Sequence, residues 1–175
     1  TTQHDAGEPF SKIDHLKEIA DEGKLNIRLY VMIGESNDDL KERINNYRLI
    51  GYANNHLTVR SIKQYIDGAL GSRGAWMIDE YADLPDSKSQ NVNSINYLRE
   101  TAKIAADNSF QLCIHAIGDR GVRETLNIYE QTFNSLDTVK DFRWRIEHSQ
   151  VVNPEDFHLF GDYNIVPSVQ PTHAT

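Results

Sequence analysis

The feature that most constrains this chain is a repeated alternation of β-rich segments with amphipathic helical segments. The β-rich segments span 24–33, 57–67, 110–119, 142–150 and 165–173, and the helical patterns span 11–23, 36–55, 92–108 and 120–135. Five strands that alternate with helices indicate an α/β fold with a parallel sheet and right-handed crossovers. Several of the strands are apolar on both faces, as a sheet covered on both sides requires.

Two architectures share this alternation, the doubly wound open sheet and the (β/α)8 TIM barrel. A complete barrel needs about 250 residues, whereas this chain has 175 and opens on polar residues typical of a loop. We therefore expect a single domain over residues 1–175 that forms the central part of a barrel, with the N- and C-terminal strands missing. An open flavodoxin-like sheet is the weaker alternative, because no glycine-rich phosphate loop follows the first expected strand.

Charge and composition exclude several classes of function. A formal net charge of −8 leaves no basic surface to bind a phosphate backbone, so we expect no nucleic-acid partner. No apolar run approaches the roughly 20 residues that a membrane-spanning helix needs, so we expect no membrane partner. The single cysteine, Cys113, excludes an intramolecular disulfide and is compatible with a cytoplasmic protein.

Polar side chains stand at the C-terminal ends of four expected strands, where parallel α/β folds place their active sites. These side chains are Lys63 and Asp67, His115 and Asp119, Glu147 and His148, and Gln170 and His173. A lone histidine on a strand is more often a hydrogen-bonded core residue than a ligand. Imidazoles at the same level of two successive strands, beside a buried lysine, favour a metal site.

Lys63 has two interpretations. It lies within the segment SIKQYID, which leaves no solvated face for its ammonium group, and burial of an unpaired charge costs several kcal/mol. One interpretation is an internal ion pair with Asp67, which shares its face of the strand. The other is a lysine converted by CO₂ to a carbamate, whose two oxygens bridge two divalent cations. The motif alone leaves both open.

Four blocks of sequence together resemble the amidohydrolase 3 family, which contains N-substituted formamide deformylase-like enzymes. The blocks are IKQYIDGALGSRGAW, CIHAIGDRGV, RIEHSQVVNPEDF and SVQPTHA, in this order. The resemblance implies a barrel with one or two divalent metal ions, usually zinc. It places Lys63 at the strand-four lysine that is carboxylated in binuclear members, and His115 and His148 at the histidine ligands of strands five and six.

The resemblance also implies a mechanism, in which metal-bound water attacks an amide carbonyl. Two parts of the family pattern are absent from the chain: the first-strand His-x-His pair, and the strand-eight aspartate that serves as general base. We therefore assign no catalytic residue here, expect the general base beyond Thr175, and expect the chain alone to be inactive.

Four further residues are expected to contact substrate. Asp67, Gly68 and Arg73 begin a loop that the family places over the pocket, and Gln170 stands at the rim. The alternative for the loop is turn chemistry, in which its glycines only supply permissive backbone. His173 is expected to be an exposed terminal histidine.

The sequence therefore predicts part of a metal-dependent hydrolase of carbon–nitrogen bonds, acting on a small amide-type molecule. The alternative is a non-catalytic α/β module that assembles through its open sheet edges. Because unpaired strand edges template pairing with other chains, we expect a homo-oligomer that buries those edges; the alternative is a barrel-interior face that is partly disordered.

Overall fold

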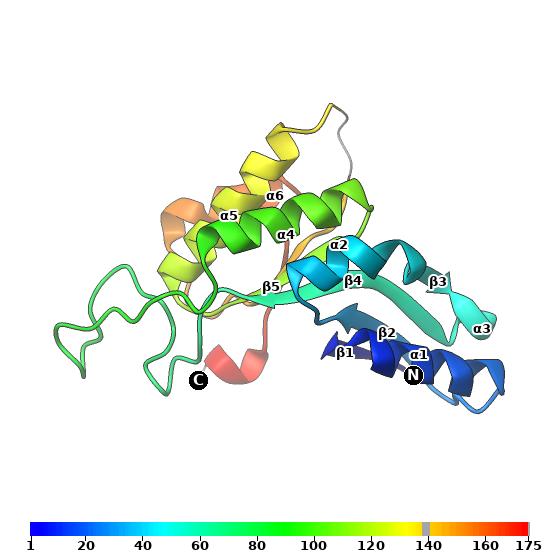
Figure 1. Ribbon diagram of the computed structural model, residues 1–175. Helices are drawn as coiled ribbons and strands as arrows, with labels where there is room; N and C mark the ends of the chain where they lie inside the picture. The colour runs from blue at the N-terminus through cyan, green and yellow to red at the C-terminus, as the bar shows by residue number, and fades with distance from the viewer. Residues whose placement is uncertain (138–140, 175) are drawn as a thin grey trace. The chain divides into compact units, whose positions relative to one another are not determined.

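The structure, a computed structural model, describes residues 1–137 and 141–174. The chain forms two compact units. The first comprises Thr1–Gln64 and Ile104–Leu112, and the second comprises Tyr65–Lys103 and Cys113–Thr175. Figure 1 shows the course of the chain with the helices α1 to α6 and the strands β1 to β5 labelled.

The first unit is built on parallel strands. β1 (Thr2–Glu8) pairs with β2 (Arg28–Ile33), and β2 pairs with β4 (Leu57–Tyr65), both in parallel. A short strand, β3 (Leu49–Gly51), pairs with β4 in the antiparallel sense. The core of this unit includes the apolar side chains Val31, Ile33, Leu57, Val59 and Ile62, all fully buried.

Helix α1 (Phe10–Asp21) begins directly after Pro9, which occupies the N-cap position. Its buried side chains are Phe10, Ile13, Leu16 and Ala20. This spacing of three or four residues is that of a helix with one apolar face. The ring of Phe10 stacks on that of Tyr47 at 4.1 Å between centroids, which ties α1 to the segment after α2 (Asn37–Arg43).

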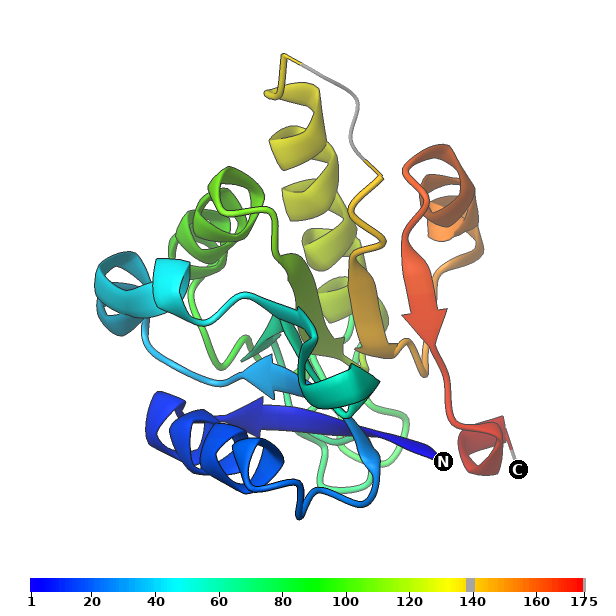
Figure 2. The same ribbon diagram turned by 90° about the vertical axis from the view of Figure 1, so that its right-hand side faces the viewer.

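In the second unit three parallel strands alternate along the chain with helical segments. β5 (Gln111–Ala116) pairs from Cys113 onward with β6 (Arg145–His148), and β6 pairs with β7 (Val166–Ser168), all in parallel. Helix α5 (Asp119–Asn134) follows β5. The short helices η2 (Pro154–Asp156) and α6 (Phe157–Asp162) follow β6, and Figure 2 shows α6 beside β7.

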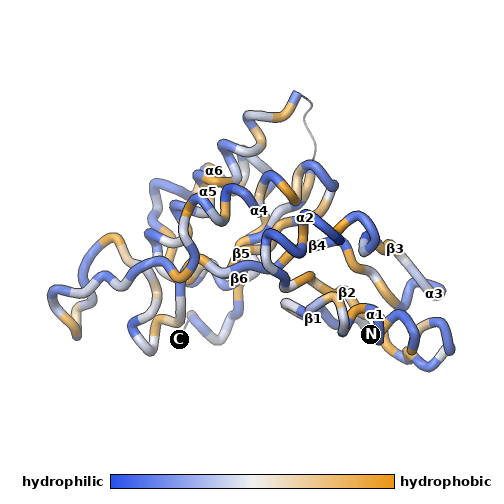
Figure 3. Tube along the Cα trace, viewed as in Figure 1, coloured by the Kyte–Doolittle hydropathy of each residue, from blue (hydrophilic) through white to orange (hydrophobic). Residues whose placement is uncertain are grey.

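Aromatic packing joins α5 to the start of β6. Trp144 is fully buried and meets Tyr129 edge-on at 4.8 Å between ring centroids. The Tyr129 hydroxyl donates to the carbonyl of Arg145 at 2.9 Å, so this buried phenol keeps a hydrogen-bond partner. In Figure 3 β5 itself is drawn largely in the hydrophobic colour, consistent with a strand buried on both faces.

The predicted α/β class with parallel strands that alternate with helices is confirmed. Three of the predicted helices correspond to α1, α4 (Ile95–Asp107) and α5 with bounds that differ by no more than a few residues. The predicted strands correspond to β2, β4, β5, β6 and β7. The glycine-rich segment that follows β4 has no helix or strand before α4, as predicted.

Three local predictions are wrong. The helix predicted over 36–55 ends at Arg43, and the short elements η1 (Ile44–Asn46), β3 and α3 (Tyr52–Asn55) follow it. Asparagine competes with the helical backbone and tolerates left-handed conformations, and Asn54 and Asn55 both have positive φ. The opening loop is strand β1, whose polar side chains hide it from a hydrophobic pattern. The strand predicted over 165–173 ends at Ser168.

The long segment between β4 and α4 is held against the start of α5 by the carboxylate of Asp67. This carboxylate accepts hydrogen bonds from the backbone N–H groups of Trp76 at 2.9 Å, Ile117 at 3.0 Å and Gly118 at 2.8 Å. Gly118 permits the close approach, because a Cβ atom there would lie 2.1 Å from the carbonyl oxygen of Trp76. The segment is therefore built onto the β5–α5 turn.

We expect Asp67→Ala to lower the free energy of unfolding by at least ~3 kcal/mol, because it leaves three amide donors without an acceptor. Asp83→Ala is the matched control from the same segment. Its exposed carboxylate pairs with the partly exposed Arg73, and exposed ion pairs of this kind contribute little to stability. Urea denaturation measures both. Equal losses for the two variants would show that Asp67 does not anchor the segment.

Candidate active site

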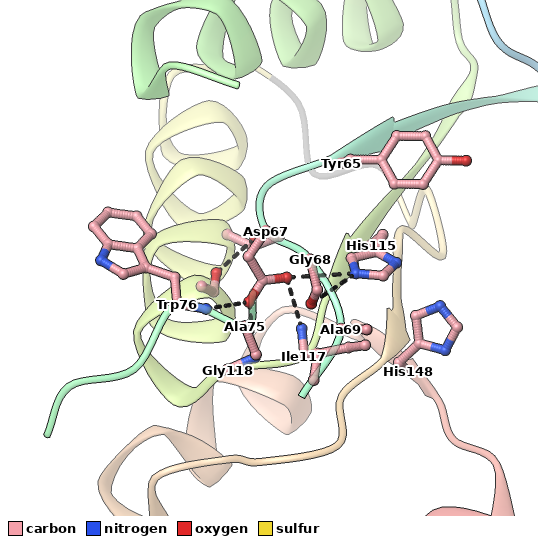
Figure 4. Close-up of polar contacts among 12 residues, drawn as sticks. Tyr65, Asp67, Gly68, Ala69, Ala75, Trp76, His115, Ile117, Gly118 and His148 are labelled. Carbon is pink, nitrogen blue, oxygen red and sulfur yellow. Dashed lines mark hydrogen bonds and ion pairs between the residues drawn. The ribbon is translucent and has the colours of Figure 1, made fainter. Parts of the chain in front are cut away.

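Two histidines from neighbouring strands meet at the C-terminal ends of β5 and β6. The ring centroids of His115 and His148 lie 4.6 Å apart, with the rings inclined at 71° to each other. Figure 4 shows both rings on the same side of the strands, beside the loop that carries Asp67 and Gly68. The sequence pattern predicted these two imidazoles at one level of the sheet, and the structure places them there.

The backbone of His148 explains how its ring reaches His115. The strand register pairs His115 with Glu147 rather than with His148, and strict alternation would send the His148 side chain to the opposite face. His148 has φ of 76° and the next residue, Ser149, has φ of 41°. Left-handed backbone at non-glycine residues is costly and is concentrated at functional sites.

Each imidazole presents one nitrogen to a protein acceptor. The Nε2 of His115 lies 3.4 Å from the carbonyl oxygen of Gly68 and 3.6 Å from a carboxylate oxygen of Asp67. The Nδ1 of His148 lies 2.8 Å from the side-chain oxygen of Gln170. Histidines that bind metals are usually oriented in this way, with the nitrogen that does not bind the metal donating to a carbonyl or carboxylate.

Asp67 is the most buried charged group at this site, with a side chain that is 0% exposed. Burial raises the pKa of its carboxyl above the ordinary value, while its three backbone donors and the nearby His148 act in the opposite direction. Both carboxylate oxygens are engaged by backbone N–H groups. The arrangement is that of a group that organises the loop and His115.

A cavity of about 590 Å³ opens beside the two histidines. Its lining residues are Ala69, Leu70, Gly71, His115, Ile117, His148, Gln150 and His173. The lining is mostly apolar apart from the imidazoles and the amide of Gln150, which is the composition usual for small-molecule sites. The volume also falls within the range of such sites, about 300–1,000 Å³.

Sequence reasoning missed several of these lining residues. Gln150 lies two residues after His148, just beyond the end of β6, and the rule that sites gather at strand ends could have found it. Ala69 and Leu70 carried no chemical signal. His173 is exposed, as expected, yet it also lines the cavity, with its ring centroid 6.0 Å from that of His148.

Lys63 is buried near the end of β4, and its ammonium group donates to the carbonyl oxygen of Gln64 at 2.9 Å. It belongs to the first unit, whereas His115 and His148 belong to the second. That the three side chains share one metal site therefore stays a prediction, as does the alternative ion pair between Lys63 and Asp67.

The residues predicted to contact substrate have other partners in the structure. Arg73 forms a two-point ion pair with Asp83, with donor–acceptor distances of 3.2 and 2.8 Å. The carbonyl of Gly68 and the amide of Gln170 face the two histidine rings, and Asp67 binds backbone N–H groups. Substrate contact by these four residues stays a prediction.

Within residues 1–137 and 141–174, no group of three or more His, Cys, Asp or Glu side chains is placed to hold a metal ion. None of the helices described there has the length and apolar composition required to cross a membrane. The histidine pair therefore provides two candidate ligands, and a complete metal site needs more.

The chain is similar in sequence to parts of two curated proteins. It is 37% identical over 117 residues to the Protein LONG AFTER FAR-RED 3 of Arabidopsis thaliana. The aligned residues make up 67% of this chain and 20% of that protein. The chain is also 29% identical over 112 residues to the Putative amidohydrolase YtcJ of Bacillus subtilis (strain 168). Here the aligned residues make up 63% of this chain and 20% of that protein. The chain thus spans about a fifth of the length of these curated relatives.

The fold has a close counterpart among solved structures. An uncharacterized metal-dependent hydrolase from Pyrococcus horikoshii superimposes with a TM-score of 0.80 and 28% sequence identity. The match covers 97% of this chain and 32% of that protein. Residues 4–175 match the sequence pattern of the amidohydrolase family. The chain belongs to the amidohydrolase family.

Proposed function

We propose that this chain provides part of the active site of a metal-dependent hydrolase that cleaves carbon–nitrogen bonds in small amide or N-acyl compounds. The observation that carries the proposal is the pair of His115 and His148 at the edge of the cavity, each with one ring nitrogen directed at a protein acceptor. Family membership and the likeness to a metal-dependent hydrolase support the same reaction class.

The side chains of the second unit fit a divalent metal. If the Nε2 of His115 and the Nδ1 of His148 carry the protons, then the Nδ1 of His115 and the Nε2 of His148 are the nitrogens that bind the metal. Neutral imidazole is a preferred ligand of zinc. Because the described residues contain no group of three ligands, we expect this chain by itself to bind metal weakly.

The metal, when bound, would lower the pKa of a coordinated water and polarise the substrate carbonyl. The chain's own residues would hold and orient the reacting groups. Asp67 and the Gly68 carbonyl keep the ring of His115 in place, and the loop at Ala69 and Leu70 forms a wall of the cavity. This apolar wall would exclude water from one side of the substrate and favour substrates with an apolar substituent.

Removal of either histidine should weaken metal binding in the intact protein. We expect His115→Ala and His148→Ala each to lower zinc affinity at least ~10-fold and to abolish hydrolysis of N-acyl and N-formyl test compounds. His158→Ala is the control, because this exposed imidazole hydrogen-bonds the local carbonyl of Glu155. Titration calorimetry and metal analysis measure the affinity, and unchanged values in both site variants would refute the proposal.

Lys63 provides a separate test of whether the site is binuclear. A neutral lysine amine adds CO₂ by forming an N–C bond and losing one proton, which yields the anionic carbamate. If Lys63 bridges two metals in this form, Lys63→Ala should lower metal content and rate together. Small carboxylates with added metal should restore part of both. If Lys63→Ala keeps its full metal content and rate, Lys63 is a structural side chain only. The control is Lys12→Ala, on the exposed face of α1, which should leave metal content and rate unchanged.

A further inference from the structure

We infer that Gln170 is a positioning residue that fixes the proton of His148 on Nδ1 and so directs Nε2 into the cavity. The inference concerns the tautomer of His148, and only its consequence for metal binding rests on the proposed function. It assigns Gln170, which the sequence suggested as a substrate contact, a role that acts through another side chain.

The geometry of the contact carries the inference. The side-chain oxygen of Gln170 lies 2.8 Å from the Nδ1 of His148, a distance typical of a short N–H···O hydrogen bond. A carbonyl oxygen only accepts, so the imidazole nitrogen that faces it must carry the proton in the neutral ring. The other nitrogen, Nε2, then keeps its lone pair.

The backbone around Gln170 holds the amide at this point. Its own carbonyl accepts a hydrogen bond from the N–H of His173 at 3.0 Å, which closes the turn of η3 (Pro171–Ala174). Pro171 follows directly, and its ring fixes φ at the next position. Gln170 lies two residues beyond the end of β7, and β7 pairs with β6, the strand that ends at His148.

The side-chain amide of Gln170 has two possible orientations, which exchange the positions of its oxygen and its NH₂ group. Were its NH₂ directed at His148, the Nδ1 would have to accept and the proton would move to Nε2. This orientation would point an N–H group into the cavity and leave no lone pair there for a metal. The two orientations therefore predict opposite tautomers, which makes the inference directly measurable.

Near-isosteric variants separate the acceptor from the shape of the side chain. A carboxylate in place of the amide offers only acceptors, so Gln170→Glu should keep the Nδ1–H tautomer. Gln170→Leu removes the acceptor and should shift His148 towards Nε2–H, which is the tautomer that a neutral histidine side chain favours in water. Gln150→Leu is the matched control, because it removes an amide from the wall of the same cavity without removing the acceptor at Nδ1.

Long-range ¹H–¹⁵N correlation spectra of the metal-free intact protein test the tautomer without any catalytic assay. The spectra are taken at a pH well above the ordinary histidine pKa of about 6.5, and His148→Ala identifies the signals. We expect Nδ1–H in the wild type, in Gln170→Glu and in Gln150→Leu, and a shift to Nε2–H in Gln170→Leu. An Nε2–H tautomer in the wild type, or no change in Gln170→Leu, would overturn the inference.

Metal affinity gives the second readout. Loss of an outer hydrogen-bond partner of a ligating histidine typically weakens metal binding about 10- to 100-fold, so Gln170→Leu should lower zinc affinity by about that factor while Gln170→Glu retains it. A raised KM with unchanged metal affinity and unchanged tautomer would make Gln170 a substrate contact and overturn the inference.

The two readouts also separate this inference from the proposed function. A wild-type protein that shows Nδ1–H at His148 but binds no metal would remove the proposed function and leave the tautomer assignment standing. A protein that binds metal through His148 but shows Nε2–H in the metal-free state would remove the inference and leave the proposed function standing.

Discussion

The carboxylate of Asp67 is the interaction on which the candidate site depends. It lies just beyond the end of β4, is fully buried, and accepts hydrogen bonds from three backbone N–H groups. Two of those donors, Ile117 and Gly118, belong to the turn between β5 and α5. The same carboxylate lies 3.6 Å from His115. One side chain therefore links the loop that lines the cavity to the strand that carries the first histidine.

The second histidine is positioned by different means. His148 ends β6 with a left-handed backbone, and this local conformation turns its ring towards His115 against the alternation of the strand. Such a conformation persists only where surrounding contacts hold it. The hydrogen bond between Gln170 and His148 is one such contact, and Ser149 supplies others through its N–H to Ala116 and its hydroxyl to Ile146.

Much of this could be predicted from the sequence, because the relevant signals are local. Apolar periodicity located α1, α4 and α5, and the strand-end rule singled out His115 and His148 together with Asp67 and Gln170. What the sequence does not encode locally was missed. The strand β1 forms from polar residues through pairing with β2. The helix expected over 36–55 ends at Arg43, and the short elements η1, β3 and α3 follow it.

The roles of the site residues were harder to predict than their positions. Asp67 and Gln170 carry groups that bind substrates as readily as they bind protein, and only the tertiary contacts show that Asp67 faces backbone donors and Gln170 faces an imidazole. The left-handed backbone of His148 was equally hidden, because no glycine marks it. Sequence pattern thus indicated where the chemistry lies, and packing decides what each side chain does there.

The central claim is that His115 and His148 bind one metal ion, and anomalous diffraction tests it most directly. Crystals of the intact protein grown with Zn²⁺ would be measured at the zinc absorption edge. We expect an anomalous peak ~2.1 Å from the Nε2 of His148 and from a ring nitrogen of His115, the usual zinc–imidazole distance. A fully occupied zinc peak elsewhere in the protein, with neither imidazole coordinated, would contradict it.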